Sequence, residues 1–147
     1  MLTRTRILEL IPHQGTMCLL DEVTAWADAT ITCHTRSHLS PDNPLRRSGG
    51  LNVVCGIEYG LQAAALHGAL LAGGPQPAGY LAALRSVEFL AERLDDSSLG
   101  ALEVTARLEL RDIGGMLYGF RLRSSDGADL LTGRAAIVLP APAADMI

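Results

Sequence analysis

The chain has 147 residues, of which 48% are apolar, and a formal net charge of −4. These values are typical of one globular domain, which we expect to span residues 1–147. The sequence contains no lysine, which excludes Schiff-base catalysis by lysine and a phosphate-binding P-loop. The arginines are scattered among acidic residues, so we expect no nucleic-acid partner.

The cysteines and the first residues indicate the compartment. Cys18, Cys33 and Cys55 are odd in number, far apart and without a CxxC pair, as is typical of reduced thiols. The opening MLTRTRILEL has no long apolar run of the kind that marks a signal peptide. We therefore expect a cytoplasmic protein.

In chain order, the pattern predicts two strands, one long helix and four further strands. A short helix or extended arm comes first and ends at Ile11-Pro12, because proline restricts the residue before it. Short turns between the later strands predict an antiparallel meander. The predicted elements are the arm at 3–10, strands at 17–25 and 29–36, a loop at 38–50, the helix at 51–71, strands at 79–91, 102–110, 116–123 and 129–139, and a frayed tail at 140–147.

The predicted strand at 102–110 alternates between apolar and polar residues along its whole length. Apolar side chains occupy every even position from Leu102 to Leu110, and polar side chains lie between them. This pattern predicts one buried face, which includes Leu110, and one face in water.

The helix at 51–71 is apolar or small on nearly every side, which predicts a central helix buried all round. Glu58 is its only charged residue, and two interpretations of it stay open. It is either a structural carboxylate bonded to backbone or to Gln62, or a catalytic acid or base with a raised pKa. We reject a membrane span, because Asn52, Gln62 and His67 place polar groups round the segment.

Two segments resemble a known family. Residues 11–23 read IPHQGTMCLLDEV and resemble the LPHR-x-P-(M/F)-LL-(V/L)-D-R-V opening of 3-hydroxyacyl-[acyl carrier protein] dehydratases. Residues 56–63 read GIEYGLQA and resemble the E-x-x-x-Q pattern of their central helix. The resemblance covers most of the chain. It implies an α+β hot-dog fold, in which an antiparallel sheet of five to six strands wraps round one long helix.

One departure from the family pattern changes the expected site. Fatty-acid dehydratases carry a catalytic histidine in a GHFPG loop before the central helix, and Pro44 occupies that position here. The segment at 49–62, GGLNVVCGIEYGLQ, is closer to the aryl-polyene type of dehydratase, which keeps the histidine of the opening motif. This similarity assigns the base to His13, with His38 as the substitute.

The resemblance also implies the other site residues. Glu58, with a pKa raised by burial, would be the acid that protonates the leaving hydroxyl, and His13 the base that removes the C2 proton. We expect this pair to form across a dimer interface. Backbone amides near Gly56 and Ala83 would bind the thioester oxygen, and Gln62 would also bind substrate. No metal or organic cofactor is implied.

The expected partners follow from the same family. We expect a homodimer joined edge to edge through its sheets, and acyl carrier protein as the bearer of the substrate. Because carrier proteins are acidic, Arg46 and Arg47 in the loop before the helix are a candidate docking pair, although solvated loop charges explain them equally well. His34 and His67 are expected to be structural.

Two other functions remain open at this point. Hot-dog thioesterases activate water with a carboxylate on the same helix, so the fold permits hydrolysis of an acyl thioester. A chain without the loop histidine is also compatible with a non-catalytic subunit that binds acyl chains or completes a heterodimer.

Overall fold

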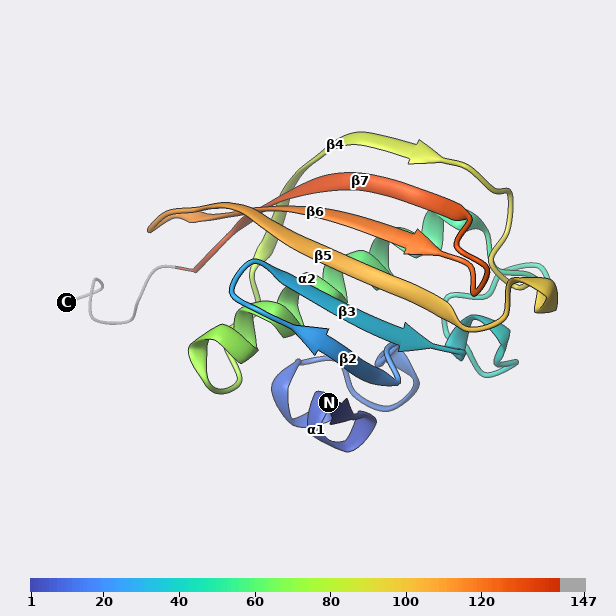
Figure 1. Ribbon diagram of the computed structural model, residues 1–147, viewed down its shortest axis with the longest axis horizontal. Coiled ribbons are helices and arrows are strands. Elements are labelled where there is room, and N and C mark those ends of the chain that lie inside the picture. Colours follow the sequence, from blue (N-terminus) through green and yellow to red (C-terminus); the bar gives the residue numbers. More distant parts are fainter. Residues whose placement is uncertain (141–147) are drawn as a thin grey trace.

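The computed structural model describes residues 1–140 and contains one antiparallel sheet and one long helix (Figure 1). The expected tail at 140–147 therefore falls, apart from Pro140, outside the described residues. The helices are α1 (Arg4–Leu10) and α2 (Gly56–Ala72), with short 3-10 turns at Gly15–Met17, Ser37–Leu39, Val53–Cys55 and Ser97–Leu99. The strands are β1 (Leu2–Thr3), β2 (Glu22–Trp26), β3 (Thr30–Thr35), β4 (Tyr80–Phe89), β5 (Leu102–Arg111), β6 (Gly115–Arg123) and β7 (Asp129–Val138).

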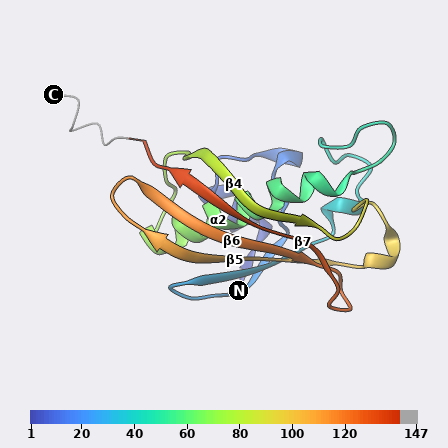
Figure 2. The same cartoon turned by 90° about the horizontal axis from the view of Figure 1, so that it is seen from above.

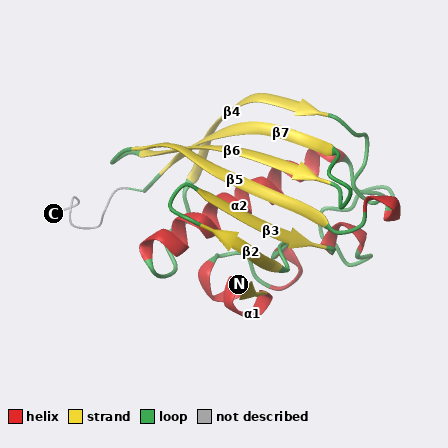
Figure 3. Cartoon of the chain, viewed as in Figure 1, coloured by secondary structure: helices red, strands yellow, loops and turns green. Residues whose placement is uncertain are grey.

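The strands form one sheet in the order β1-β2-β3-β5-β6-β7-β4. Helix α2 runs along one face of this sheet, and the short α1 lies beyond β2 (Figures 1 and 3). The hot-dog architecture expected from the sequence is confirmed. The sheet has seven strands rather than five to six, because Leu2 and Thr3 pair with Val23 and Glu22 of β2.

The predicted strand at 17–25 begins only at Glu22. Gly15 has a φ of 58°, a conformation that favours glycine, and residues 15–17 form a 3-10 turn instead of strand. The following Leu19 and Leu20 are fully buried. The apolar run in this segment therefore fills the core without joining the sheet.

Helix α2 begins at Gly56 rather than at residue 51. The side chain of Asn52 accepts a hydrogen bond from the Val54 N–H and caps the short 3-10 turn before the helix. Gly73, with a φ of 79°, ends α2. The helix is not buried all round as predicted, since Ala65 and Ala72 are exposed. Figure 2 shows the sheet on one side of α2 only, which explains this exposure.

The alternation predicted for residues 102–110 holds only as far as Leu108. Leu108 lies opposite Tyr118, but Leu110 lies opposite Leu117, so the register shifts by one residue between them. Such a bulge turns the following side chains to the other face of the sheet. Leu110 is consequently 63% exposed instead of buried. Arg111, paired with Met116, takes the helix side of the sheet instead.

Strand β4 forms an open edge of the sheet and carries large apolar side chains. Leu81, Leu84 and Phe89 are between 39% and 48% exposed, although Leu84 lies opposite the buried Ala135 of β7.

No helix of the described residues meets the length and hydropathy that a membrane span requires.

Candidate active site

His13 and Glu58 lie side by side. His13 Nε2 is 3.3 Å from Glu58 Oε1, and the two side chains are 27% and 31% exposed. His13 comes from the loop after α1, and Glu58 from the first turn of α2. A single chain therefore brings the two groups together, and their expected place at a dimer interface stays a prediction.

The loop that carries His13 is fastened on both sides. The Arg4 guanidinium donates hydrogen bonds of 2.7 Å to the carbonyl oxygens of Gly15 and Cys18. Gln14 Nε2 donates a bond of 2.7 Å to the Leu8 carbonyl. These contacts hold the loop against α1, so the position of the imidazole is fixed by the fold of the N-terminal segment.

Gln62 positions the carboxylate from the other side. This side chain is fully buried. Its Nε2 donates to the Met17 carbonyl at 2.7 Å and to Glu58 Oε1 at 3.3 Å, while its Oε1 accepts from the Leu19 N–H at 2.9 Å. The amide thus joins Glu58 to the segment after the 3-10 turn at residues 15–17. Its expected role in substrate binding stays a prediction.

The pKa of Glu58 is lowered, whereas the sequence led us to expect a raised value. The polar contact with His13 is the largest cause of the lowering, burial opposes it, and the Gln62 hydrogen bond adds to it. In this arrangement the carboxylate carries its charge at neutral pH. The prediction of a raised pKa considered only desolvation and left out the lowering that the expected contact with His13 causes.

A cavity of about 690 Å³ begins at His13 and extends along α2. Most of its wall is apolar, and the helix contributes small residues, so open space remains beside it. Ala64 and Ala65 line the cavity, whereas the neighbouring Ala63 does not. Arg111 also lines the cavity, and sequence analysis missed it because the alternation placed residue 111 on the opposite face. The wall residues from α2 are Leu61, Ala64, Ala65, Gly68 and Ala72.

The two expected thioester-binding positions lie elsewhere. The Gly56 N–H donates to the Val53 and Val54 carbonyls. A Cβ on Gly56 would lie 2.7 Å from a Leu131 methyl, so this glycine permits close packing on the sheet. Ala83 lies opposite Ala136 in β4, and neither Gly56 nor Ala83 lines the cavity. Both binding roles stay predictions.

Arg46 and Arg47 are bonded to their own loop. Arg46 Nη2 donates to the Gly49 carbonyl at 3.0 Å, and Arg47 Nη1 donates to the Pro44 carbonyl at 3.0 Å. Arg46 also lies 3.9 Å from the largely buried carboxylate of Asp95. Their role in carrier-protein docking stays a prediction.

The other histidines lie away from the carboxylate. His38 is fully buried, and its Nε2 bonds to the Gly100 carbonyl at 2.8 Å; burial lowers its pKa. His67 is also fully buried, with Nδ1 at 2.7 Å from the Tyr118 hydroxyl and Nε2 at 2.8 Å from the Ala27 carbonyl. Both rings therefore serve packing. Within residues 1–140, no three His, Cys, Asp or Glu side chains cluster as metal ligands would.

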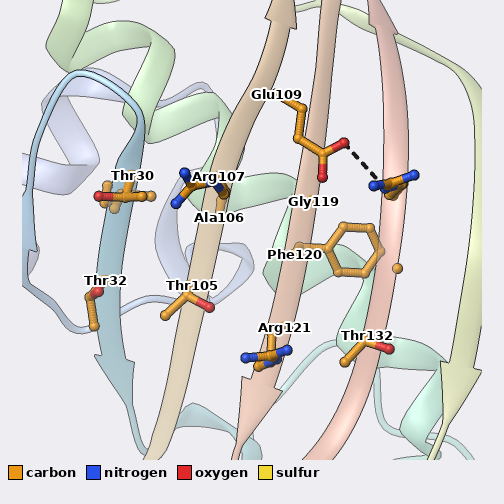
Figure 4. Close-up of a pocket in the computed structure, with 13 residues that line it drawn as sticks. Thr30, Thr32, Thr105, Ala106, Arg107, Glu109, Gly119, Phe120, Arg121 and Thr132 are labelled. Carbon is orange, nitrogen blue, oxygen red and sulfur yellow. Dashed lines mark ion pairs between the residues drawn. The ribbon is translucent and has the colours of Figure 1, made fainter.

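A second hollow, of about 460 Å³, lies on the face of the sheet opposite α2 (Figure 4). Glu109 extends from β5 over Gly119 of β6 to Arg134 of β7, with an ion-pair distance of 3.2 Å. A Cβ on Gly119 would lie 2.9 Å from the Glu109 carboxylate, so glycine leaves the room for this crossing. Arg107 and Arg121 also border the hollow, which shares no residue with the His13 cavity.

Comparison with known proteins identifies the family. The model of the ApeP-like family, described as ApeP dehydratase, matches residues 5–147. A chain of the dehydratase heterocomplex ApeI:P from Xenorhabdus doucetiae is similar in structure, with a TM-score of 0.80 and 22% identity over 92% of this chain and 91% of that chain. Curated proteins give no significant sequence match.

Two more distant structures share the fold. AziG from S. sahachiroi has a TM-score of 0.60 and 13% identity, over 82% of this chain and 91% of that chain. A hypothetical thioesterase from Streptococcus pneumoniae TIGR4, solved with coenzyme A, has a TM-score of 0.58 and 13% identity, over 81% and 84%. Similarity at these identities shows the fold alone, whereas the family model covers nearly the whole sequence. The chain therefore belongs to the ApeP-like dehydratase family, the hot-dog dehydratases of the aryl-polyene type.

Proposed function

We propose that this chain removes water from 3-hydroxyacyl thioesters carried on acyl carrier protein and forms trans-2-enoyl thioesters, with His13 as base and Glu58 as acid. The observation that carries the proposal is the 3.3 Å contact between these side chains, of which His13 lines a largely apolar cavity. The reaction needs one proton removed at C2 and one supplied to the leaving hydroxyl. An imidazole in the cavity wall and a carboxyl group 3.3 Å from it meet that need.

The base is best assigned to one nitrogen of His13. Nε2 faces Glu58, whereas Nδ1 is buried and has no hydrogen-bond partner among the described residues. A neutral imidazole with its proton on Nε2 keeps an unprotonated lone pair on Nδ1. That lone pair would take the C2 proton of the substrate once binding exposes Nδ1, which is buried in the free chain.

The lowered pKa of Glu58 is compatible with an acid role once substrate is bound. The contact with His13 is the main cause of the lowering, and burial acts against it. A substrate hydroxyl inserted between the two side chains would replace that contact and leave burial, which favours the protonated carboxyl. Glu58 would then protonate the departing hydroxyl. After product release, the His13 imidazolium would lose the proton taken from C2 to solvent, and Glu58 would take up a proton from solvent when the next substrate separates it from His13.

Substitution of each group tests the assignment. We expect Glu58→Gln and His13→Gln to lower the turnover of a 3-hydroxyacyl thioester by about 10²- to 10⁴-fold, measured as enoyl product by mass spectrometry. Glu22→Gln, an exposed position on β2, is the matched control and should keep wild-type turnover. Unchanged turnover in Glu58→Gln would reject the acid role.

A saturated acyl thioester in the same assay separates dehydration from hydrolysis. A saturated substrate offers no hydroxyl to eliminate, so a dehydratase leaves it intact. Release of free thiol from this substrate, without dehydration of the 3-hydroxyacyl thioester, would favour the thioesterase alternative.

A second hot-dog subunit is part of the proposal. Strand β4 is an unpaired edge with exposed apolar residues, and such an edge is normally covered in the native assembly. We propose that β4 pairs edge to edge with β4 of a second copy in the cytoplasm. Light scattering after size exclusion should give twice the 15.6 kDa chain mass. A chain that has the monomer mass alone, and about twice that mass only when mixed with a different hot-dog subunit, would indicate a heterodimer.

A further inference from the structure

The β5 bulge places the positive charge of Arg111 in the wall of a largely apolar cavity. Leu108 faces the interior opposite Tyr118, and strict alternation would then put Arg111 on the outer face. The register shift reverses this, and Arg111 lines the cavity beside its strand partner Met116. Among the described residues, Arg111 is the only arginine in that wall.

The turn that follows fixes the end of β5. Asp112 Oδ1 accepts hydrogen bonds from the Gly114 N–H at 2.8 Å and from the Gly115 N–H at 3.0 Å. Arg111 itself is exposed, and within residues 1–140 no carboxylate lies at ion-pair distance from it. A guanidinium held at the rim of a cavity and lacking an acidic partner there is suited to bind an anionic ligand group.

Contacts between α2 and β6 place Arg111 at the far end of the cavity from the catalytic pair. Gly60, half a turn after Glu58, packs against Phe120, and His67 bonds to Tyr118. Moving two residues towards the start of β6, from Phe120 to Tyr118, thus moves the contacted helix residue from Gly60 to His67, closer to the end of α2. The next such step reaches Met116, the partner of Arg111.

The distance between the catalytic pair and the far end of the cavity indicates the kind of ligand. The first and last α2 residues of the cavity wall are Leu61 and Ala72. From Glu58, three residues before Leu61, to Ala72 the helix rises roughly 21 Å, at 1.5 Å per residue. This is the extended length of about six amino-acid residues. The pantoate, β-alanine and cysteamine units of a phosphopantetheine arm, with the reacting carbons of the acyl group, form a flexible chain of comparable length that ends in a phosphate.

We propose that Arg111 binds the phosphate of a phosphopantetheine thioester whose arm lies along α2 and whose reacting carbons lie at His13. This inference rests on the proposed dehydration. It also places the carrier protein near the β5–β6 hairpin rather than at Arg46 and Arg47, which precede the start of α2. Carrier protein and coenzyme A both present this phosphate.

The test compares 3-hydroxyacyl thioesters of pantetheine, which lacks the phosphate, and of phosphopantetheine, using the full chain in its native assembly. Wild type should show the lower KM for phosphopantetheine. Arg111→Ala should raise that KM by roughly tenfold, the effect of one charge-assisted hydrogen bond, and so remove the difference between the substrates. Arg111→Lys, which keeps the charge, should retain most of the KM difference between the two substrates. Arg107→Ala on the outer face is the control and should leave both KM values unchanged.

The outcomes separate this inference from the proposed function. Equal KM values for the two substrates in wild type, or an equal rise of both in Arg111→Ala, would overturn the phosphate site while dehydration stands. Failure of wild type to dehydrate either substrate would overturn both. Coenzyme A and carrier-protein thioesters then identify the source, since the thioester whose KM rises more in Arg111→Ala is the one whose phosphate the guanidinium binds. Thermal melting verifies that Arg111→Ala folds.

Discussion

Replacing Gly60 and Gly68 of α2 by alanine should change the free energy of unfolding in opposite directions. A Cβ on Gly60 would lie 2.6 to 2.9 Å from Phe120 atoms, including its Cβ. The tip of the ring already fills the space beside another glycine, because Phe120 Cζ lies 2.8 Å from the position that a Cβ on Gly133 would take. Gly68, in the same helix, has no atom within 4 Å of its added Cβ.

The expected magnitudes follow from these distances. Replacing a helical glycine by alanine stabilises the folded state by about 1 kcal/mol. An extra methyl in a packed core costs about 1–3 kcal/mol, and the tight packing round Phe120 places Gly60 at the upper end of that range. We therefore expect Gly60→Ala to lower the free energy of unfolding by about 2 kcal/mol and Gly68→Ala to raise it by about 1 kcal/mol.

Thermal unfolding at equal protein concentration measures both variants. For a chain of this size, 1 kcal/mol shifts Tm by about 2–4 °C, so Gly60→Ala should melt roughly 4–8 °C below wild type and Gly68→Ala a few degrees above it. A Tm for Gly60→Ala at or above that of wild type would refute the close packing of α2 on Phe120. It would mean that the ring moves at little cost.

Three further results are expected. The contact with His13 holds the pKa of Glu58 below its ordinary 4.5, so the contribution of Glu58 to stability is complete above pH 4.5 and is lost as the pH falls through the folded-state pKa. Urea unfolding of Glu58→Gln should therefore lack this part of the acid sensitivity. Identical pH profiles for the variant and wild type would contradict this expectation. Burial raises the pKa of Cys33 to about 12, so a thiol reagent at about pH 8 should label Cys33 only after unfolding, and native labelling would show an open core there. Leu84→Lys on the β4 edge should yield monomers in light scattering, whereas Leu110→Lys at the exposed bulge should not; dimers in both would place the interface elsewhere.

Much of the site was predictable from two short motifs. The PH motif and the E-x-x-x-Q pattern singled out His13, Glu58 and Gln62, and the structure brings these three together. The roles of Gly56 and Ala83 rested on resemblance alone. In the fold, the Gly56 amide is bonded within the helix start and Ala83 lies outside the cavity, so spacing along the chain did not determine their surroundings.

The architecture, the central helix and the family could be read from the sequence alone, because they depend on periodicity, turn residues and local motifs within each segment. The direction of the Glu58 pKa shift depends on the folded structure, since burial and the His13 contact oppose each other and their balance is set by the packing of distant segments. The folded structure likewise decided that Arg111 enters the cavity. A bulge is a mismatch in residue number between two paired strands. The sequence of β5 alone does not reveal it, because it appears only in the pairing of β5 with β6.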